Sequence, residues 1–356
     1  MNIGIIGRIA EGVELVDGQT IKTKILLNEL KNIYPEATYN IADSYNSKKK
    51  LISYLSQVRK CLKNSDVVFV LLSRNGIKIT FPYIYLLNKN YKKPIIHDVI
   101  GGCLDELAKE NPITLKCIKS FYINMVESNG LAKRLHEIGV KNVAVIPNFK
   151  RVDIIKENEF SDINSAAFKF CTFSRVSKAK GISEAILAIN DINKKNVANK
   201  VKLDIYGPIE ADYVDEFNQL LSVSDKAINY RGCVDYSKSV DILKEYSALL
   251  FPTTFYGEGF PGTIIDAFSA GIPVIATDWH CNPEIIEDGY SGFLYPSSKP
   301  EMLKCKIEEF MSRPEIIPIM KVNCTLKAKE YQADLVMKKV VDIMNCAIYE
   351  LSNIVK

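Results

Sequence analysis

Histidine and tryptophan are scarce in this sequence, and its cysteines follow no ligand-like spacing. The 356 residues include three histidines and one tryptophan, and the nine cysteines are odd in number, widely spaced and never arranged as Cys-x-x-Cys. So few histidines argue against a histidine-based metal cluster, and the cysteine spacing argues against both a zinc site and a disulfide framework. The cysteines instead fit a reducing cytoplasm.

Long apolar runs are also missing. No run approaches the roughly 20 residues that are needed to span a bilayer. The first residues, MNIGIIGR, are too short and wrongly flanked for a secretory signal and predict a first buried strand. We therefore expect a soluble or peripheral protein.

The composition predicts two globular domains that differ in charge. Apolar residues make up 47% and charged residues 25%, which is ordinary for a soluble protein. At roughly 100–200 residues per domain, the length favours two domains. Residues 1–150 hold 22 Lys and Arg against 13 Asp and Glu, whereas the remainder holds 24 against 29. A basic first half and an acidic second half suggest different partners for each.

Short apolar runs alternate with helical patterns in both halves, which predicts β-α-β units and parallel sheets. Expected strands lie at Ile3–Ile6, Val67–Leu72, Pro94–His97, Val143–Asn148, Lys169–Phe173, Val201–Tyr206, Ala248–Phe251 and Pro273–Ala276. Expected helices include Thr20–Asn32 and Lys49–Lys63. The predicted class is α/β, with two Rossmann-like, doubly wound lobes and a cleft between them.

We expect the lobes to occupy residues 1–150 and 151–340, with a polar linker over 151–167. A C-terminal helix over 341–356 could cross back to the first lobe. Ligands of such sheets bind at the carboxyl ends of the strands.

The densest group of chemically useful residues lies in 256–276, YGEGFPGTIIDAFSAGIPVIA. It predicts a glycine-rich turn, a helix and a strand, with Pro261 at the first helical position. Glycines 257, 259 and 262 let the backbone approach a ligand closely, and the N–H groups of the helix start can bind hydroxyl or phosphate oxygens.

Two acids belong to this stretch. Glu258 precedes the expected helix and Asp266 lies about two turns into it, which separates them by about 12 Å along a helix axis. They could hold opposite ends of an extended ligand, but they are too far apart to act as acid and base on one bond. The alternative is a plain strand–turn–helix with a solvated Glu258 and a surface contact at Asp266.

Two cations follow the first expected strand of the second half, in the segment SRVSKAKG at 174–181. Arg175 and Lys180 could both stabilise negative charge that grows on a leaving group. Taken alone, a basic loop of this kind is more often a solvated surface.

Together these motifs resemble retaining glycosyltransferases of family 4, or glycosyl transferases group 1, which have the GT-B fold. That family is marked by two glutamates separated by seven residues, then an alanine-rich helix and Gly-x-Pro-Val. Here Glu258 is followed by Asp266, one methylene shorter than the family's second glutamate, and by Gly271-Ile272-Pro273-Val274. The resemblance is strong over 170–296 and fair over 1–25 and 140–149. Elsewhere it is limited to the expected order of strands and helices.

The resemblance implies a role for each motif. Arg175 and Lys180 would grip the diphosphate, and Asp266 would bind the ribose. The donor sugar would be held by Glu258 and by the main chain of Gly259, Phe260, Pro261 and Gly262. The backbone of Cys233 and Val234, after an expected strand end at Tyr230-Arg231-Gly232, would read the base.

Two further donor-side residues come from the first half. The segment Asp17–Thr23 is not the Gly-x-Gly-x-x-Gly fingerprint but resembles the loop after strand one in members that build capsular or other surface polysaccharides. Gly18 would permit a tight loop against the donor, although an ordinary turn fits as well. Family members often place an N-terminal histidine near the donor sugar, and His97 is the best placed here, with Asp98 as the competing candidate.

The reaction implied by the resemblance is metal-independent transfer of a hexose-type sugar from a nucleotide-diphosphate sugar to an acceptor hydroxyl, with retention. Acceptor and leaving group would share one face, and the departing phosphate would take the acceptor proton. No covalent nucleophile, bound metal or separate cofactor is implied.

The basic first half suggests an acceptor partner. The run Lys48-Lys49-Lys50 opens a helix whose expected core stripe is Leu51, Leu55, Val58 and Leu62. Its charges could be a solvated rim or could attract anionic lipid at the inner face of the plasma membrane. We expect a lipid-linked or oligosaccharide acceptor, a cytoplasmic location and no nucleic-acid partner.

Two other functions remain open at this point. One is a sugar-nucleotide epimerase or a phosphorylase on the same fold. The other is a catalytically silent nucleotide-sugar-binding subunit of a polysaccharide assembly complex, for which the aspartate at 266 is the supporting feature. Fold alone does not decide between them.

Overall fold

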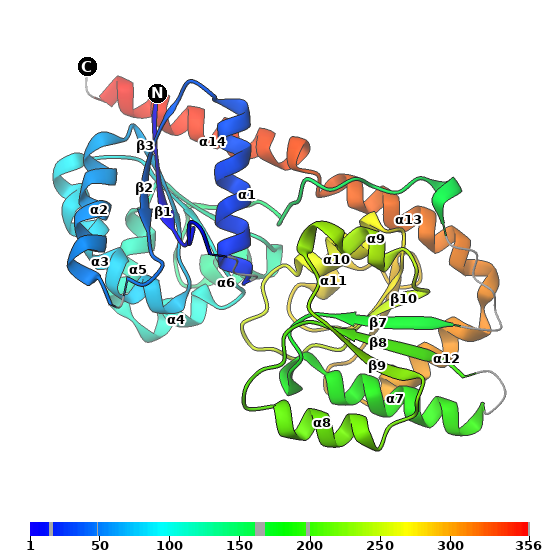
Figure 1. The fold of residues 1–356 in the computed structure, drawn as a ribbon. Helices are drawn as coiled ribbons and strands as arrows, with labels where there is room; N and C mark the ends of the chain where they lie inside the picture. The colour runs from blue at the N-terminus through cyan, green and yellow to red at the C-terminus, as the bar shows by residue number, and fades with distance from the viewer. Residues whose placement is uncertain (14–16, 48, 161–167, 197–199, 355–356) are drawn as a thin grey trace. The chain divides into compact units, whose positions relative to one another are not determined.

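The computed structural model describes residues 1–13, 17–47, 49–160, 168–196 and 200–354 and divides into two compact units (Figure 1). The first unit is Met1–Asn148 together with Ala333–Lys356, and the second is Phe149–Gln332. Residues 333–340, expected in the second lobe, group with the first because they begin a long C-terminal helix. Lys48 and residues 161–167, named above in the basic run and the linker, lie outside the described residues.

The first unit is built on six parallel strands in the order β2-β1-β3-β4-β5-β6. They are β1 (Asn2–Gly7), β2 (Thr38–Asp43), β3 (Val67–Leu71), β4 (Ile95–Asp98), β5 (Ile123–Val126) and β6 (Val143–Val145). Every residue of β3 is fully buried, because helices cover both faces of the sheet.

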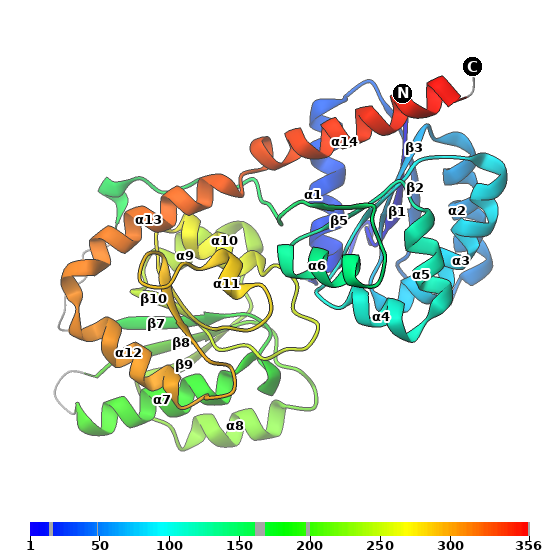
Figure 2. The ribbon, with the colours of Figure 1, turned by 180° about the vertical axis from the view of Figure 1, so that it is seen from behind.

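Most helices of the first unit connect successive strands, and the last comes from the end of the chain. They are α1 (Gly18–Ile33), α2 (Leu51–Asn64), α3 (Arg74–Tyr91), α4 (Leu104–Glu110), α5 (Pro112–Ser120), α6 (Asn129–Glu137) and α14 (Ala333–Ile354). Helices α2 and α3 lie on one side of the sheet and α1 on the other (Figures 1 and 2). The buried face of α2 is Tyr54, Val58, Cys61 and Leu62, whereas Leu51 is 40% exposed, so the expected core stripe was wrong at its first residue.

The second unit repeats the plan with six parallel strands in the order β12-β11-β10-β7-β8-β9. They are β7 (Lys169–Phe173), β8 (Lys202–Tyr206), β9 (Ile228–Gly232), β10 (Ala248–Phe251), β11 (Val274–Thr277) and β12 (Gly292–Tyr295). The order confirms the prediction of a doubly wound α/β fold in both lobes.

Two apolar cores, one on each face of this sheet, hold the helices of the second unit. The helices are α7 (Ile182–Lys195), α8 (Val214–Ser222), α9 (Ser239–Leu243), α10 (Gly262–Ser269), α11 (Asn282–Ile285), α12 (Met302–Ser312) and α13 (Ile317–Glu330). Part of the expected linker also packs here, since Ile155 is buried and its N–H donates to the carbonyl of Ser269 at 3.0 Å. None of the described helices combines the length and the apolar character that crossing a bilayer requires.

Candidate active site

The candidate site lies where the strand order of the second sheet reverses. β7 and β10 are hydrogen-bonded neighbours, with β8 and β9 continuing on one side and β11 and β12 on the other. The loops that leave the carboxyl ends of β7 and β10 therefore start side by side, at the position where ligands of such sheets usually bind. These two loops carry Arg175, Lys180 and Glu258, so the fold brings together the three residues expected to be catalytic there.

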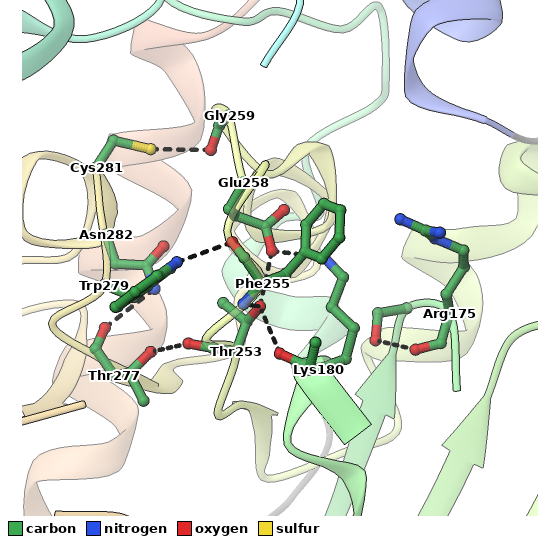
Figure 3. Close-up of polar contacts among 12 residues, drawn as sticks. Arg175, Lys180, Thr253, Phe255, Glu258, Gly259, Thr277, Trp279, Cys281 and Asn282 are labelled. Carbon is green, nitrogen blue, oxygen red and sulfur yellow. Dashed lines mark hydrogen bonds and ion pairs between the residues drawn. The ribbon is translucent and has the colours of Figure 1, made fainter. Parts of the chain in front are cut away.

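Lys180 and Glu258 form a nearly buried ion pair (Figure 3). Lys180 Nζ lies 2.5 Å from Glu258 Oε2, and their side chains are 10% and 11% exposed. The hydroxyl of Thr253, two residues beyond β10, donates to the same carboxylate oxygen at 2.8 Å. Two donors thus compensate a carboxylate that would otherwise be costly to bury.

Arg175 lies at the more exposed side of the site. Its Nη1 is 2.6 Å from Glu210 Oε1, and 48% of its side chain is exposed. The guanidinium also lies over the ring of Phe255, with 5.1 Å between its central carbon and the ring centroid. A cation that is paired but exposed can exchange a carboxylate for an incoming phosphate at little desolvation cost.

The glycine-rich loop ends one residue later than its pattern predicts. Helix α10 begins at Gly262, so Pro261 is the N-cap with extended backbone and not the first helical residue. Asp266 is in consequence the fifth helical residue, about one turn into the helix rather than two. The ring of Phe260 is buried edge-to-face against Tyr331, with the centroids 5.1 Å apart, so this side chain belongs to the core.

Asp266 is held by a partner that the sequence did not suggest. Lys150 Nζ lies 2.6 Å from Asp266 Oδ2, and the aspartate side chain is 5% exposed. Its second oxygen, Oδ1, is buried without a hydrogen-bond partner in the described part of the chain. An unmet buried acceptor of this kind is a place for a hydroxyl donor.

The segment after β9 reaches the same edge of the sheet. The carbonyl of Gly232 accepts a hydrogen bond of 2.9 Å from the N–H of Gly207, which follows β8. Cys233, the next residue, is exposed. The structure therefore places Cys233 and Val234 at the carboxyl edge of the strands, as main-chain contacts with a base would require.

Gly18 and His97 belong to the first unit. Gly18 is the exposed first residue of α1, and a Cβ there would meet no atom within 4 Å. Asp17 caps the helix by accepting from Thr20 N at 3.2 Å. The turn is thus an ordinary capped helix start whose open side leaves room for a ligand.

His97 is a core residue and not a surface group. Its side chain is fully buried on β4, its ring packs edge-on against Phe81 and Phe121, and Nδ1 lies 2.9 Å from Asn124 Oδ1. Burial lowers the pKa of His97 to about 4, despite the opposing hydrogen bond that His97 donates to Asn124. This placement does not suit the predicted contact with a donor sugar, because the buried strand points the ring into the core.

The sequence of the second unit matches a known protein family. The family model described as "Glycosyl transferases group 1" matches residues 153–330, half of the 356-residue chain. The chain belongs to this family. The motifs that resembled it all lie within the matched stretch, apart from the two in the first half.

Individual glycosyltransferases agree with that assignment. An uncharacterized glycosyltransferase of Methanocaldococcus jannaschii is 24% identical over 60% of this chain and 52% of its own length. A putative colanic acid biosynthesis glycosyltransferase of Salmonella typhimurium is 27% identical over 38% of this chain and 34% of its own length. The chain thus spans about half or less of these curated relatives.

Among solved structures, the Anabaena protein HepE in complex with UDP superposes with a TM-score of 0.76 at 14% identity. The match covers 97% of this chain and 100% of the other. At that identity the likeness shows the fold, which is the two-lobed α/β fold of GT-B glycosyltransferases.

Several residues of the candidate site were missed by sequence reasoning. Thr253 bonds Glu258, Phe255 contacts Arg175, Trp279 bonds the glycine-rich loop, and Lys150 pairs with Asp266. Thr253 could have been found, because it follows a strand end at the switch point. Lys150 could not, because 116 residues separate it from its partner. Within the described residues, no three or more His, Cys, Asp and Glu side chains gather so that they could hold a metal ion.

Proposed function

We propose that this chain is a retaining, family 4 glycosyltransferase that moves a hexose-type sugar from a nucleotide-diphosphate sugar to an acceptor hydroxyl. One observation carries the proposal. The Lys180–Glu258 pair, with Thr253, lies at the switch point beside Arg175 in a member of the group 1 family. In this nearly buried pair, Lys180 is a cation for the leaving diphosphate and Glu258 is an acceptor for sugar hydroxyls.

The cations act on the leaving group. As the bond to the anomeric carbon breaks, negative charge grows on the diphosphate, and Arg175 and Lys180 stabilise this charge more in the transition state than in the ground state. Transfer of Lys180 from Glu258 to the diphosphate would free the carboxylate to bind donor hydroxyls.

Glu258 binds the sugar and does not attack it. Its Oε2 atom accepts from the hydroxyl of Thr253, a bond that the move of Lys180 to the diphosphate leaves in place and that lowers the nucleophilicity of the carboxylate. The acceptor hydroxyl therefore approaches on the same face as the leaving group, and the departing phosphate takes its proton without a metal ion.

The remaining donor contacts come from main chain and from Asp266. The N–H groups between Gly259 and Gly262, at the start of α10, suit sugar hydroxyls or phosphate oxygens. The Oδ1 atom of Asp266 suits a ribose hydroxyl. The main chain of Cys233 and Val234 faces the base, and UDP bound to HepE makes uracil the first base to test.

The test is a thermal-shift screen of the purified protein against UDP, GDP, ADP, CMP and their common sugar conjugates. A ligand at 100 times its dissociation constant adds about 2.7 kcal/mol of stability, which raises the melting temperature visibly. We expect one nucleotide family to stabilise the protein and Arg175→Ala to abolish the effect. No response at millimolar concentration would refute donor binding.

A catalytically silent nucleotide-sugar-binding subunit is the second candidate, because Lys150 neutralises Asp266 in the structure. The two candidates differ in turnover. A transferase releases nucleoside diphosphate from the stabilising donor when bacterial membrane extract supplies acceptors, and a silent subunit binds the donor without releasing it.

We also propose that the acceptor is a lipid-linked or oligosaccharide intermediate of bacterial surface polysaccharide, reached at the inner face of the plasma membrane. The colanic acid relative and the basic first half support this proposal. Lys49 and Lys50 are exposed at the start of α2, next to Ile52, which is 87% exposed. Such a group suits an anionic lipid surface at about 1 kcal/mol for each cation.

Cosedimentation with vesicles tests this surface. We expect binding to vesicles that contain anionic phosphatidylglycerol, weaker binding by the Lys49→Glu/Lys50→Glu variant, and no binding to neutral phosphatidylcholine. Equal binding by the variant and the wild type would assign the lysines to a solvated rim.

A further inference from the structure

The ring of Phe255 contacts both cations of the candidate site (Figure 3). The Arg175 guanidinium carbon and the Lys180 ammonium nitrogen each lie 5.1 Å from the centroid of its ring. The face of an aromatic ring carries partial negative charge and attracts cations within about 6 Å. One half-buried ring thus contacts both groups that are proposed to meet the diphosphate.

Hydrogen bonds fix the main chain of Phe255 on both sides. Its N–H donates to Thr253 Oγ1 at 3.2 Å, and that hydroxyl donates to Glu258 at 2.8 Å. Its carbonyl accepts the indole N–H of Trp279 at 2.8 Å (Figure 3). These bonds fix the backbone of Phe255 relative to Glu258, and from that backbone the ring contacts both cations.

Trp279 is one of three donors, at the end of β11 and in the loop that follows it, that bond carbonyls of the loop after β10. The hydroxyl of Thr277 donates to Thr253 O at 2.6 Å, and the thiol of Cys281 donates to Gly259 O at 3.0 Å. Three bonds spread over seven residues hold the whole loop from one side.

These bonds also orient the N–H groups of the loop. In a planar trans peptide the carbonyl and the N–H point in opposite directions. The peptide after Thr253 follows this rule, because its carbonyl meets Thr277 while the N–H of Thr254 donates to Ala179 O at 2.8 Å. The peptide after Gly259 has its carbonyl toward Cys281, so the N–H of Phe260 points away from the loop after β11.

We propose that Phe255, anchored by Trp279, is a positioning residue that holds Arg175 and Lys180 ready for the two phosphates of a nucleoside diphosphate. This role rests on the proposed function and adds to it the means by which two long, flexible side chains are held in place. Glu210 and Glu258 occupy N–H donors of the cations, and a diphosphate must displace these carboxylates. The ring of Phe255 occupies none of the N–H donors of the two cations. Its contacts with them can therefore persist when the phosphates bind.

The test compares diphosphate and nucleoside affinities in matched variants. Phe255→Leu removes the aromatic face and keeps an apolar side chain, whereas Phe255→Tyr keeps the aromatic face. Trp279→Phe removes the anchoring N–H and keeps an aromatic side chain, although a smaller one. Binding of UDP is measured by isothermal titration and that of uridine by competition against UDP. Melting temperatures are recorded in parallel.

We expect Phe255→Leu to lower the ratio of UDP to uridine affinity by about tenfold, the loss of two cation–π contacts, with uridine affinity unchanged. Phe255→Tyr should keep the ratio, and Trp279→Phe should lower it by a smaller factor. A ratio that Phe255→Leu leaves unchanged, whatever the melting temperature does, overturns the positioning role. A wild-type protein with no preference for UDP over uridine overturns the diphosphate grip of the proposed function, and with it this role.

Discussion

Lys180 and Glu258 form an ion pair that is almost completely removed from solvent. Both side chains are about nine-tenths buried, and the distance between their charged atoms is 2.5 Å. Removing one member of such a pair leaves the other charge buried and uncompensated, which commonly costs about 3–5 kcal/mol. Loss of stability and loss of transition-state stabilisation must therefore be separated at this site.

Lys180→Met should lower the free energy of unfolding by a few kcal/mol and donor turnover by about 10²–10³-fold, the scale of one lost transition-state donor. The double variant Lys180→Met/Glu258→Gln should recover much of the stability but none of the turnover. Urea unfolding and nucleoside diphosphate release measure the two effects. Recovery of both in the double variant would mean that the pair is structural.

His97 couples the stability of the first unit to pH. Burial lowers its pKa in the folded protein to about 4, against 6.5 in an ordinary environment. The unfolded chain therefore binds a proton that the folded chain refuses, so the contribution of His97 to stability is complete above pH 6.5 and falls as the pH drops toward 4.

Between pH 6.5 and about pH 5, the free energy of unfolding should fall by about 1 kcal/mol per pH unit because of this residue. The side chain of the His97→Gln variant cannot be protonated. The slope of its unfolding free energy against pH should therefore be smaller than that of the wild type, and the difference should equal the contribution of His97. Urea unfolding at several pH values measures the difference. Parallel pH profiles for the two proteins would contradict the lowered pKa.

At the scale of elements, helix α1 is joined to the sheet through one buried lysine. The ammonium of Lys22 donates to Asp98 at 2.7 Å, to Glu127 at 2.8 Å and to the carbonyl of Val99 at 3.0 Å. These acceptors stand at the ends of β4 and β5, so all three N–H bonds of the ammonium hold the helix against two strands. Burial opposes the charged form, but the two carboxylates raise the pKa of Lys22, and burial raises the pKa of Asp98.

Lys22→Met should lower the free energy of unfolding by about 3–5 kcal/mol, because two carboxylates lose their buried counter-ion. Lys24→Met, two residues along the same helix at a partly exposed position, is the matched control and should change little. Thermal and urea unfolding give the comparison. Equal effects in the two variants would show that helix propensity, and not the ion pairs, decides the result.

Elements with strong apolar patterns were predicted well. β7 and β10 have the predicted bounds, since their buried runs end at polar loops. β2, β5 and β12 were missed. β2 and β12 are edge strands, and Asn124 interrupts the apolar run of β5, so none of the three has a continuous buried pattern like that of β10.

The whole molecule is divided so that one unit is continuous in sequence and the other is not. The second unit is the single stretch Phe149–Gln332, whereas the first needs α14 from the end of the chain. α14 buries a stripe with helical spacing, made of Val336, Met337, Val340, Met344 and Ala347. Removing the helix would expose the apolar surface against which this stripe packs.

A fragment of residues 149–332 should fold cooperatively and keep the nucleotide-dependent rise in melting temperature. A fragment of residues 1–148 should aggregate, and joining residues 333–356 to it through a flexible linker should restore a soluble monomer. Gel filtration and circular dichroism test each fragment. A soluble, cooperatively unfolding 1–148 fragment would show that α14 is dispensable for the first unit.

The sequence by itself determined the α/β class, the two lobes and the motif residues Arg175, Lys180, Glu258 and Asp266, because local apolar periodicity and glycine spacing are written in consecutive residues. The tertiary structure alone decided that Lys180 pairs with Glu258, that Lys150 meets Asp266 and that His97 is a core residue. It also decided that the indole N–H of Trp279 bonds the main-chain carbonyl of Phe255. Contacts between distant segments depend on which strands become neighbours, and bonds to main-chain atoms can be made to any residue type, so neither leaves a pattern in the sequence.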